Sequence, residues 1–230
     1  MTGRVEAIID ATTLRLEGGG ELRLAGIEVA PPSPEAAEAA RTFLSGLAAG
    51  QMVEVRHGAL ATDRYGRAVG HAFLTAAAGG PSLGALLAGA GLARVSAPLG
   101  DASCTGALLA AERAARDAGL GLWPENPPVS AYDPALRVMA DGFALVEGTV
   151  LSIGRRERTV YLNFGRDWST DFTVSMTVGA AARIEAEGGP LDALVGQRVR
   201  IRGVLADRDG PWIRVDGAWQ IEILDDTDGR

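Results

Sequence analysis

The stretch Leu22–Pro31, Leu-Arg-Leu-Ala-Gly-Ile-Glu-Val-Ala-Pro, decides the fold of the first half of the chain. Its apolar residues at 22, 24 and 27 predict a strand, which Pro31 ends because proline cannot extend a hydrogen-bonded ladder. Arg23 and Glu28 would face opposite sides of a regular strand, since side chains alternate along it. A bulge at Gly26 would shift this phase and bring the guanidinium and the carboxylate together at the end of the strand.

The residues around this stretch predict a short meander followed by helices and two more strands. Strands are expected at 3–10 and 13–17, and three glycines at 18–20 turn the chain into Leu22–Pro31. Ser33 suits a helix N-cap and Pro34 suits the first helical position, so a helix is expected to about Ala49. The remaining elements expected in this half are strands at 51–56 and 66–74 and helices at 81–90 and 104–118.

The order of three strands, a helix, two strands and more helix is typical of a five-stranded oligonucleotide/oligosaccharide-binding (OB) barrel. A proline-rich segment at 126–136 predicts a linker between a first domain at 1–125 and a second at 137–230. The second domain repeats the order, with strands at 143–153, 158–165, 170–177, 197–205, 211–215 and 218–224 and a helix at 179–187. We therefore expect a mainly β, α+β protein of two OB-type five-stranded barrels, the first with appended helices.

The composition limits the classes of partner. The chain has 230 residues, 47% of them hydrophobic, and a net charge of −7, which disfavours general nucleic-acid binding because that depends on clustered positive charge. Its basic residues are all arginine, and Cys104 is its only cysteine, so no internal disulfide is possible. Without an apolar leader or a membrane-length apolar stretch, no membrane partner is expected. The chain as given is expected in the cytoplasm, and a trimmed leader would place it in the periplasm or outside the cell.

Five segments of residues 1–123 resemble the thermonuclease, or staphylococcal-nuclease-like, family in order and spacing. They are Ile9–Leu16, Leu22–Glu28, Asp63–Arg67, Gly91–Ala93, and Ala111–Arg116 with Leu120–Trp123. The resemblance implies phosphodiester hydrolysis with a calcium ion held by carboxylates, a glutamate that activates water, and two arginines that bind the phosphate. The arginines correspond to Arg23 and Arg67.

The calcium site and the general base depart from the family pattern. The family's Gly-Asp-Thr reads Ala11-Thr12-Thr13, so Thr12 replaces a metal carboxylate, and Glu28 replaces a metal aspartate. Asp10 matches a neighbouring acid that either joins the metal site or only caps a turn. Pro31 stands where the family has its base. Glu35 lies four residues further on, and the helix macrodipole already explains a glutamate in a first helical turn.

Contacts to a substrate are also reduced. The family has tyrosines a few residues past its Gly-Leu-Ala, where this chain has Ala97 and Leu99. Tyr65, next to Arg64, remains as a candidate for contact with a nucleotide, and it suits a packed turn equally well.

The second domain is similar to an OB module found downstream of some bacterial thermonuclease-like domains. Single-strand binders of this fold combine a basic groove with aromatic stacking platforms. The residues of suitable character are Arg155, Arg156, Arg158, Tyr161, Phe164 and Trp168, with Trp212 and Arg214. The alternative is that the aromatic residues form the barrel core and the arginines are solvated.

Three functions remain open from the sequence. The leading hypothesis is a thermonuclease-like protein with a degenerate active site, which binds single-stranded nucleic acid or another phosphate-bearing ligand weakly and salt-sensitively, without efficient cleavage. The second is an active metal-dependent nuclease that uses Asp10, Glu28 and Glu35 in rearranged roles with calcium as cofactor. The third is a scaffold that presents its loops to a protein partner.

Overall fold

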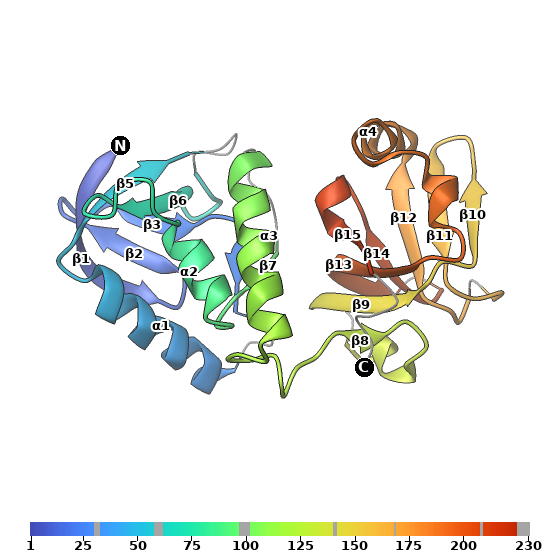
Figure 1. Ribbon diagram of the computed structural model, residues 1–230, viewed down its shortest axis with the longest axis horizontal. Helices are drawn as coiled ribbons and strands as arrows, with labels where there is room; N and C mark the ends of the chain where they lie inside the picture. The colour runs from blue at the N-terminus through green and yellow to red at the C-terminus, as the bar shows by residue number, and fades with distance from the viewer. Residues whose placement is uncertain are drawn as a thin grey trace. The chain divides into compact units, whose positions relative to one another are not determined.

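The computed structural model describes residues 1–29, 33–57, 62–96, 102–139, 142–167, 169–207 and 209–224 (Figure 1). The chain forms two compact units, Met1–Pro127 and Pro128–Arg230. Each unit has its own hydrophobic core, one built around Leu14, Leu22 and Leu44 and the other around Leu162, Val174 and Ile213. In the described parts of the chain, no helix is long and apolar enough to cross a bilayer.

The first unit is the expected five-stranded barrel with helices. The closed barrel runs in the order β1 (Thr2–Asp10), β2 (Thr13–Leu16), β3 (Glu21–Leu24), β6 (Ala68–Leu74) and β5 (Met52–Arg56). Its neighbouring strands are antiparallel except for β3 and β6, which pair in parallel. The parallel pair joins the strands that precede α1 in the chain to those that follow it, since β3 comes before α1 and β6 comes after it.

The single strand expected over Leu22–Pro31 is two strands in its described part. β3 ends at Leu24, Gly26 adopts a φ of +75° in the turn that follows, and β4 (Ile27–Glu28) then pairs with β7 (Arg94–Val95) outside the barrel. Hydrogen bonds from Ala25 N to Gly70 O and from Ser96 N to Gly26 O, 2.9 and 3.1 Å long, hold the turn. The expected bulge at Gly26 is therefore wrong. Gly26 lies in a turn after which the chain leaves the barrel and joins a different sheet.

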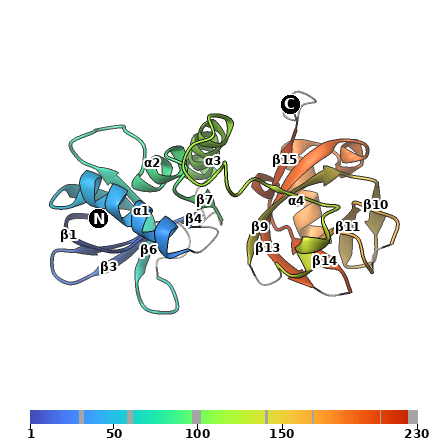
Figure 2. The same ribbon diagram turned by 90° about the horizontal axis from the view of Figure 1, so that it is seen from below.

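Three helices cover the first barrel. They are α1 (Pro34–Ala48), α2 (Leu83–Gly89) and α3 (Ala102–Asp117). Ser33 caps α1 as expected, because its hydroxyl accepts a hydrogen bond of 3.1 Å from Ala36 N. The buried stripe of α1, which includes Ala40 and Leu44, packs on the barrel core, and α2 packs against α3 (Figure 2).

The second unit has the same strand order as the first barrel, with β9 and β10 together in the place of β1. The sheet follows the path β10 (Ser152–Arg155), β11 (Thr159–Asn163), β12 (Thr173–Thr177), β14 (Pro211–Arg214), β13 (Arg198–Asp207) and β9 (Phe143–Thr149). Only residues 150 and 151 separate β9 from β10, so the two ends of this path are consecutive in the chain. Strands β12 and β14 pair in parallel, as β3 and β6 do, and α4 (Val178–Gly188) follows β12. The expectation of two OB-type barrels is confirmed.

Part of the expected linker at 126–136 folds with the second unit. β8 (Val129–Ser130) pairs in parallel with β9, and a 3₁₀ turn at Pro134–Arg137 follows it. Ala131 and Leu136 are buried in the core of this unit. The expected strand at 218–224 also differs, because a 3₁₀ turn at Ala218–Gln220 precedes β15 (Ile221–Ile223), which pairs with β13. A further 3₁₀ turn lies at Leu191–Leu194.

Candidate functional site

Three segments of the first unit bring the predicted arginines together. They are the turn between β1 and β2, strand β3, and the turn at 63–67 that leads into β6. In the β2–β3 ladder Thr13 lies opposite Arg23, and Thr13 Oγ1 accepts a hydrogen bond of 3.3 Å from Arg67 Nη1. The barrel register therefore brings both Arg23 and Arg67 next to Thr13.

Arg23 contacts the position where the family pattern has a metal carboxylate. Its Nη1 donates a hydrogen bond to Thr12 Oγ1, and its Nη2 donates to Ile27 O at 3.3 Å. Burial lowers the pKa of the Arg23 guanidinium, the charge of Asp10 counteracts this, and the charge of Arg67 adds to the lowering. Arg23 is thus a partly buried cation that a second cation approaches.

Asp10 closes the turn and also faces the arginines. Its Oδ1 accepts hydrogen bonds from Thr12 N and Thr12 Oγ1, at 2.8 and 3.2 Å, and its Oδ2 lies 4.0 Å from Arg67 Nη1. Burial would raise the pKa of Asp10, but hydrogen bonds from Thr12 and Thr13 and the charge of Arg23 outweigh it, so the pKa is lowered. Asp10 thus caps the turn between β1 and β2, one of the two roles expected from the sequence, and its carboxylate also lies near Arg67.

The turn at Asp63–Arg67 presents an exposed aromatic ring beside Arg67. Asp63 Oδ1 accepts hydrogen bonds from Tyr65 N and Arg67 N, and Asp63 Oδ2 accepts one of 2.8 Å from Arg67 Nε. The Tyr65 side chain is 68% exposed, and the guanidinium carbons of Arg64 and Arg67 lie 4.8 and 5.3 Å from its ring centroid. Arg64 also donates a hydrogen bond of 2.7 Å to the Tyr65 hydroxyl.

Glu28 reaches the same region from β4. Burial raises the pKa of its carboxyl group, while the charges of Arg23 and Arg94 act in the opposite direction. Arg94 lies opposite Glu28 in the β4–β7 pair, with its guanidinium carbon 4.9 Å from the ring centroid of Trp123. Arg94 is a member of this site that the sequence analysis missed, because only the pairing of β4 with β7 places it next to Glu28.

The residues of this site do not fit a calcium ion. Calcium prefers six to eight oxygen ligands with carboxylates among them, whereas the Thr12 oxygen accepts a hydrogen bond from a guanidinium. Within the residues that the structure describes, no group of three or more His, Cys, Asp or Glu is placed to hold a metal ion. Glu35 lies exposed in the first turn of α1, and Pro31, Ala97 and Leu99 lie outside the described residues.

A comparison with protein-family models matches this part of the chain. Residues 21–125 match the family described as staphylococcal nuclease homologue. This part of the first unit is thus similar to staphylococcal nuclease homologues. The matched range contains Arg23, Glu28, Asp63 and Arg67, while Asp10 and Thr12 lie just before it. No curated protein matches the sequence closely enough to count as a relative.

The residues expected to bind ligand in the second unit lie in different environments. Arg155 pairs with Glu185 and Asp192, at 3.0 and 2.8 Å, and Arg158 is exposed. Phe164 is only 3% exposed and packs on Phe172 with the ring centroids 5.0 Å apart, so the expectation that it stacks on a ligand does not hold. Phe164 directly follows β11, and its inward position continues the alternation along that strand.

Three of the expected residues line a groove. Arg156 and Tyr161 border a cavity of about 580 Å³ together with Trp212, and its other lining residues are Gly154, Thr159, Asn163, Thr173, Ser175, Gly210 and Pro211. Trp168 lies outside the described residues. The polar lining residues were not singled out from the sequence, although their alternation with apolar residues along β11 and β12 was a usable signal.

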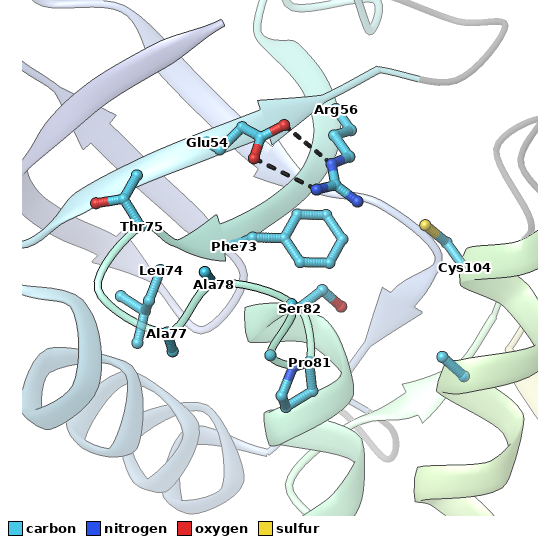
Figure 3. A pocket seen from close by; sticks show the side chains of 13 residues that line it. Glu54, Arg56, Phe73, Leu74, Thr75, Ala77, Ala78, Pro81, Ser82 and Cys104 are labelled. Atoms are coloured by element: carbon cyan, nitrogen blue, oxygen red, sulfur yellow. Dashed lines mark hydrogen bonds and ion pairs between the residues drawn. The ribbon is translucent and has the colours of Figure 1, made fainter.

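A second cavity, of about 590 Å³, lies in the first unit between β5, the β6–α2 loop and α3 (Figure 3). Arg56 pairs there with Glu54 at 3.0 Å, and its guanidinium carbon lies 4.3 Å from the ring centroid of Phe73. Cys104 and Ser82 also line it. None of its lining residues belongs to the Arg23–Arg67 site, so this cavity is not part of that site.

Proposed function

We propose that the first unit binds a phosphate-bearing ligand, in particular single-stranded nucleic acid, without efficient cleavage. The observation that carries this proposal is the hydrogen bond from Arg23 to Thr12, with Arg67 beside it. A guanidinium thus stands next to the position of a lost metal carboxylate, and the two cations remain available to a phosphate.

The hydrogen bonding of the two arginines supports phosphate binding. Arg67 uses Nε and Nη1 for Asp63 and Thr13, and no described contact uses its Nη2. Arg23 uses Nη1 and Nη2 for neutral oxygens, which a charged phosphate oxygen can replace because charge-assisted hydrogen bonds are stronger. The exposed ring of Tyr65 beside Arg67 offers a surface for an unpaired base, which favours single strands over duplexes.

The missing groups argue against efficient hydrolysis. A positioned general base contributes roughly 10²–10⁴-fold to a rate, and the sequence has Pro31 where the family has its base. Thr12 supplies no negative charge for a metal ion. The chain therefore lacks both the base with which the family activates water and one of the carboxylates with which it binds the metal.

The test is oligonucleotide binding with chelator present. A fluorescent single-stranded ten-mer is titrated with protein at 50 and 200 mM salt, and the anisotropy is measured for wild type, Arg67→Ala and Arg41→Ala. Arg41 is the control because it is an exposed arginine that pairs with Glu38 on α1. We expect Arg67→Ala to weaken binding about tenfold or more, as for loss of a charged hydrogen bond, and Arg41→Ala to change it less than twofold.

Three results would contradict this function. Calcium-dependent cleavage that Arg67→Ala abolishes would favour the active nuclease. Equal weakening by Arg41→Ala and Arg67→Ala would show that binding is unspecific. Absence of any binding at 50 mM salt would favour the protein scaffold, because electrostatic binding is strongest at low salt.

A further inference from the structure

The groove in the second unit is built on the outward face of three neighbouring strands. Along β11 and β12 buried and half-exposed residues alternate, so Val160, Leu162 and Val174 enter the core. The alternate positions on these strands and on β14 face outward, and they carry Thr159, Tyr161, Asn163, Thr173, Ser175 and Trp212. β10, β11 and β12 lie side by side in Figure 1.

The register of the strands sets the two aromatic rings on adjacent rows of this face. One row runs across the sheet from Asn163 through Thr173 to Trp212. The next row runs from Gly154 through Tyr161 to Ser175. The described residues between the rings, Thr173 and Ser175, are small, and neighbouring strands are about 4.8 Å apart, so no large described side chain stands on the sheet between the two rings.

Gly154 keeps one side of Tyr161 open. A Cβ atom at this position would lie 3.5 Å from Tyr161 Cβ and 3.7 Å from Tyr161 Cδ2. The backbone φ of Gly154 is not positive, so the chain conformation does not require glycine there. A longer side chain at this position would extend over the tyrosine ring. Glycine therefore leaves this side of the Tyr161 ring uncovered.

The lining chemistry is polar, aromatic and nearly uncharged. Arg156 is the only charged residue among the described lining residues. Among described residues no hydrogen-bond partner is found for the hydroxyl groups of Tyr161 and Ser175, and Asn163 donates to Ser152 at 3.1 Å while its Oδ1 stays available. The described lining therefore offers flat rings together with both donors and acceptors, with Arg156 as its one charged side chain.

We propose that this groove binds unpaired nucleobases, which stack on Tyr161 and Trp212 and bond to Asn163 and Ser175, while the phosphates stay outside. The inference rests on the proposed function for the choice of nucleic acid, and adds a second site with a different physical basis. A cavity of about 580 Å³ is within the usual range for small-molecule sites, roughly 300–1,000 Å³, and suits a nucleoside-sized group. Because few phosphates are neutralised, binding here should depend little on salt.

The experiment removes the phosphate site and compares two strands that differ only in their bases. Full-length Arg67→Ala protein is titrated with a labelled thymidine ten-mer and with an abasic ten-mer, at 0.1 and 0.5 M salt. We expect the thymidine strand to bind with a Kd that changes less than threefold between the two salts, and the abasic strand to bind at least tenfold more weakly.

Variants in the same background assign this binding to the groove. Tyr161→Ala and Trp212→Ala are each expected to weaken thymidine binding about tenfold, as for loss of one stacking ring. Tyr132→Ala is the control, because it removes a tyrosine that is 64% exposed and does not line the groove. Tyr161→Phe and Trp212→Phe keep a ring and should retain most of the binding, which separates lost stacking from misfolding.

Three outcomes would overturn the proposal. They are equal binding of the abasic and thymidine strands, equal loss in Tyr132→Ala, and Trp212-dependent binding of a neutral oligosaccharide such as cellotetraose with no binding of thymidine. Failure here leaves the first unit's function open, since that function is tested by the Arg67-dependent, salt-sensitive part of wild-type binding.

Discussion

The Arg23 guanidinium contacts Thr12, at the position where the family pattern has a carboxylate that binds a metal ion. In the family pattern a metal ion would balance carboxylates at positions 12 and 28, whereas here guanidinium groups lie beside Asp10 and Glu28. A fixed guanidinium cannot lower the pKa of a bound water in the way that a metal ion does. It does bind phosphate oxygens well, which is why the function proposed above is binding and not hydrolysis.

Restoring the carboxylate should restore a response to calcium. In Thr12→Asp a second carboxylate would stand next to Asp10, and a divalent ion would relieve their repulsion. We expect millimolar calcium to raise the melting temperature of Thr12→Asp and to leave that of wild type unchanged, measured by calorimetry against a chelator. Thr12→Asn is the control of equal size without the charge, and an equal calcium response in this variant would contradict the explanation.

Glu28 should reduce stability at neutral pH. Burial raises the pKa of Glu28 above its ordinary value of 4.5, so folding disfavours the charged form. A raised folded pKa contributes stability that is fully present below 4.5 and is lost as pH rises through the folded value. We expect Glu28→Gln to be more stable than wild type at pH 7 and equal to it below about pH 4, by urea denaturation. A variant that is less stable at pH 7 would show that pairing with Arg23 and Arg94 dominates.

At the scale of elements, two glycines join the end of α2 to the loop after α3. Gly91 and Gly121 have φ values of +71° and +58°, and Leu122 N donates a hydrogen bond of 2.9 Å to Gly91 O. A Cβ atom on Gly91 would lie 2.2 Å from Leu120 O, and one on Gly121 would lie 2.4 Å from Gly91 O. The backbones can approach this closely only without side chains.

Gly91→Ala should therefore destabilise the first unit by about 3 kcal/mol or more, from backbone strain and overlap together. Gly119→Ala is a matched control, because Gly119 also has a positive φ, +62°, but has nothing within 4 Å of its Cβ position. It should cost only about 1–2 kcal/mol. Both values are measurable by urea denaturation of the two variants, and equal losses would contradict the role of close approach.

Local patterns predicted most elements but not their partners. Ser33, Pro34 and the apolar spacing after them were sufficient for α1, because a helix is stabilised within its own segment. The change of sheet at Gly26 depends on Gly70 and Ser96, which are distant in sequence, so it was mistaken for a bulge. The sequence could not show that Arg23 and Arg67 converge, because their shared contact with Thr13 depends on the register of β2 with β3 and on the turn at 63–67.

At the scale of the whole molecule, the first residues after Pro127 belong to the core of the second unit. Leu136 is fully buried there, and loss of a buried leucine side chain costs about 2–5 kcal/mol. We expect a fragment of residues 128–230 to fold cooperatively and a fragment of 137–230, which starts at the boundary expected from sequence, to be less stable by at least that amount. Thermal unfolding of the two fragments tests this, and equal melting temperatures would place 128–136 outside the folded unit.

The parallel pairs β3·β6 and β12·β14 have a consequence for synthesis on the ribosome. Each pair joins strands separated by a helix and at least one other strand, so neither barrel can close until the later strand has left the exit tunnel. The first barrel can close while the second is still being translated, since domains generally fold as units in the order of their synthesis. A pause placed between the codons for β6 and β8 would therefore give the first barrel time to form before the strands of the second, which have the same topology, become available for incorrect pairing.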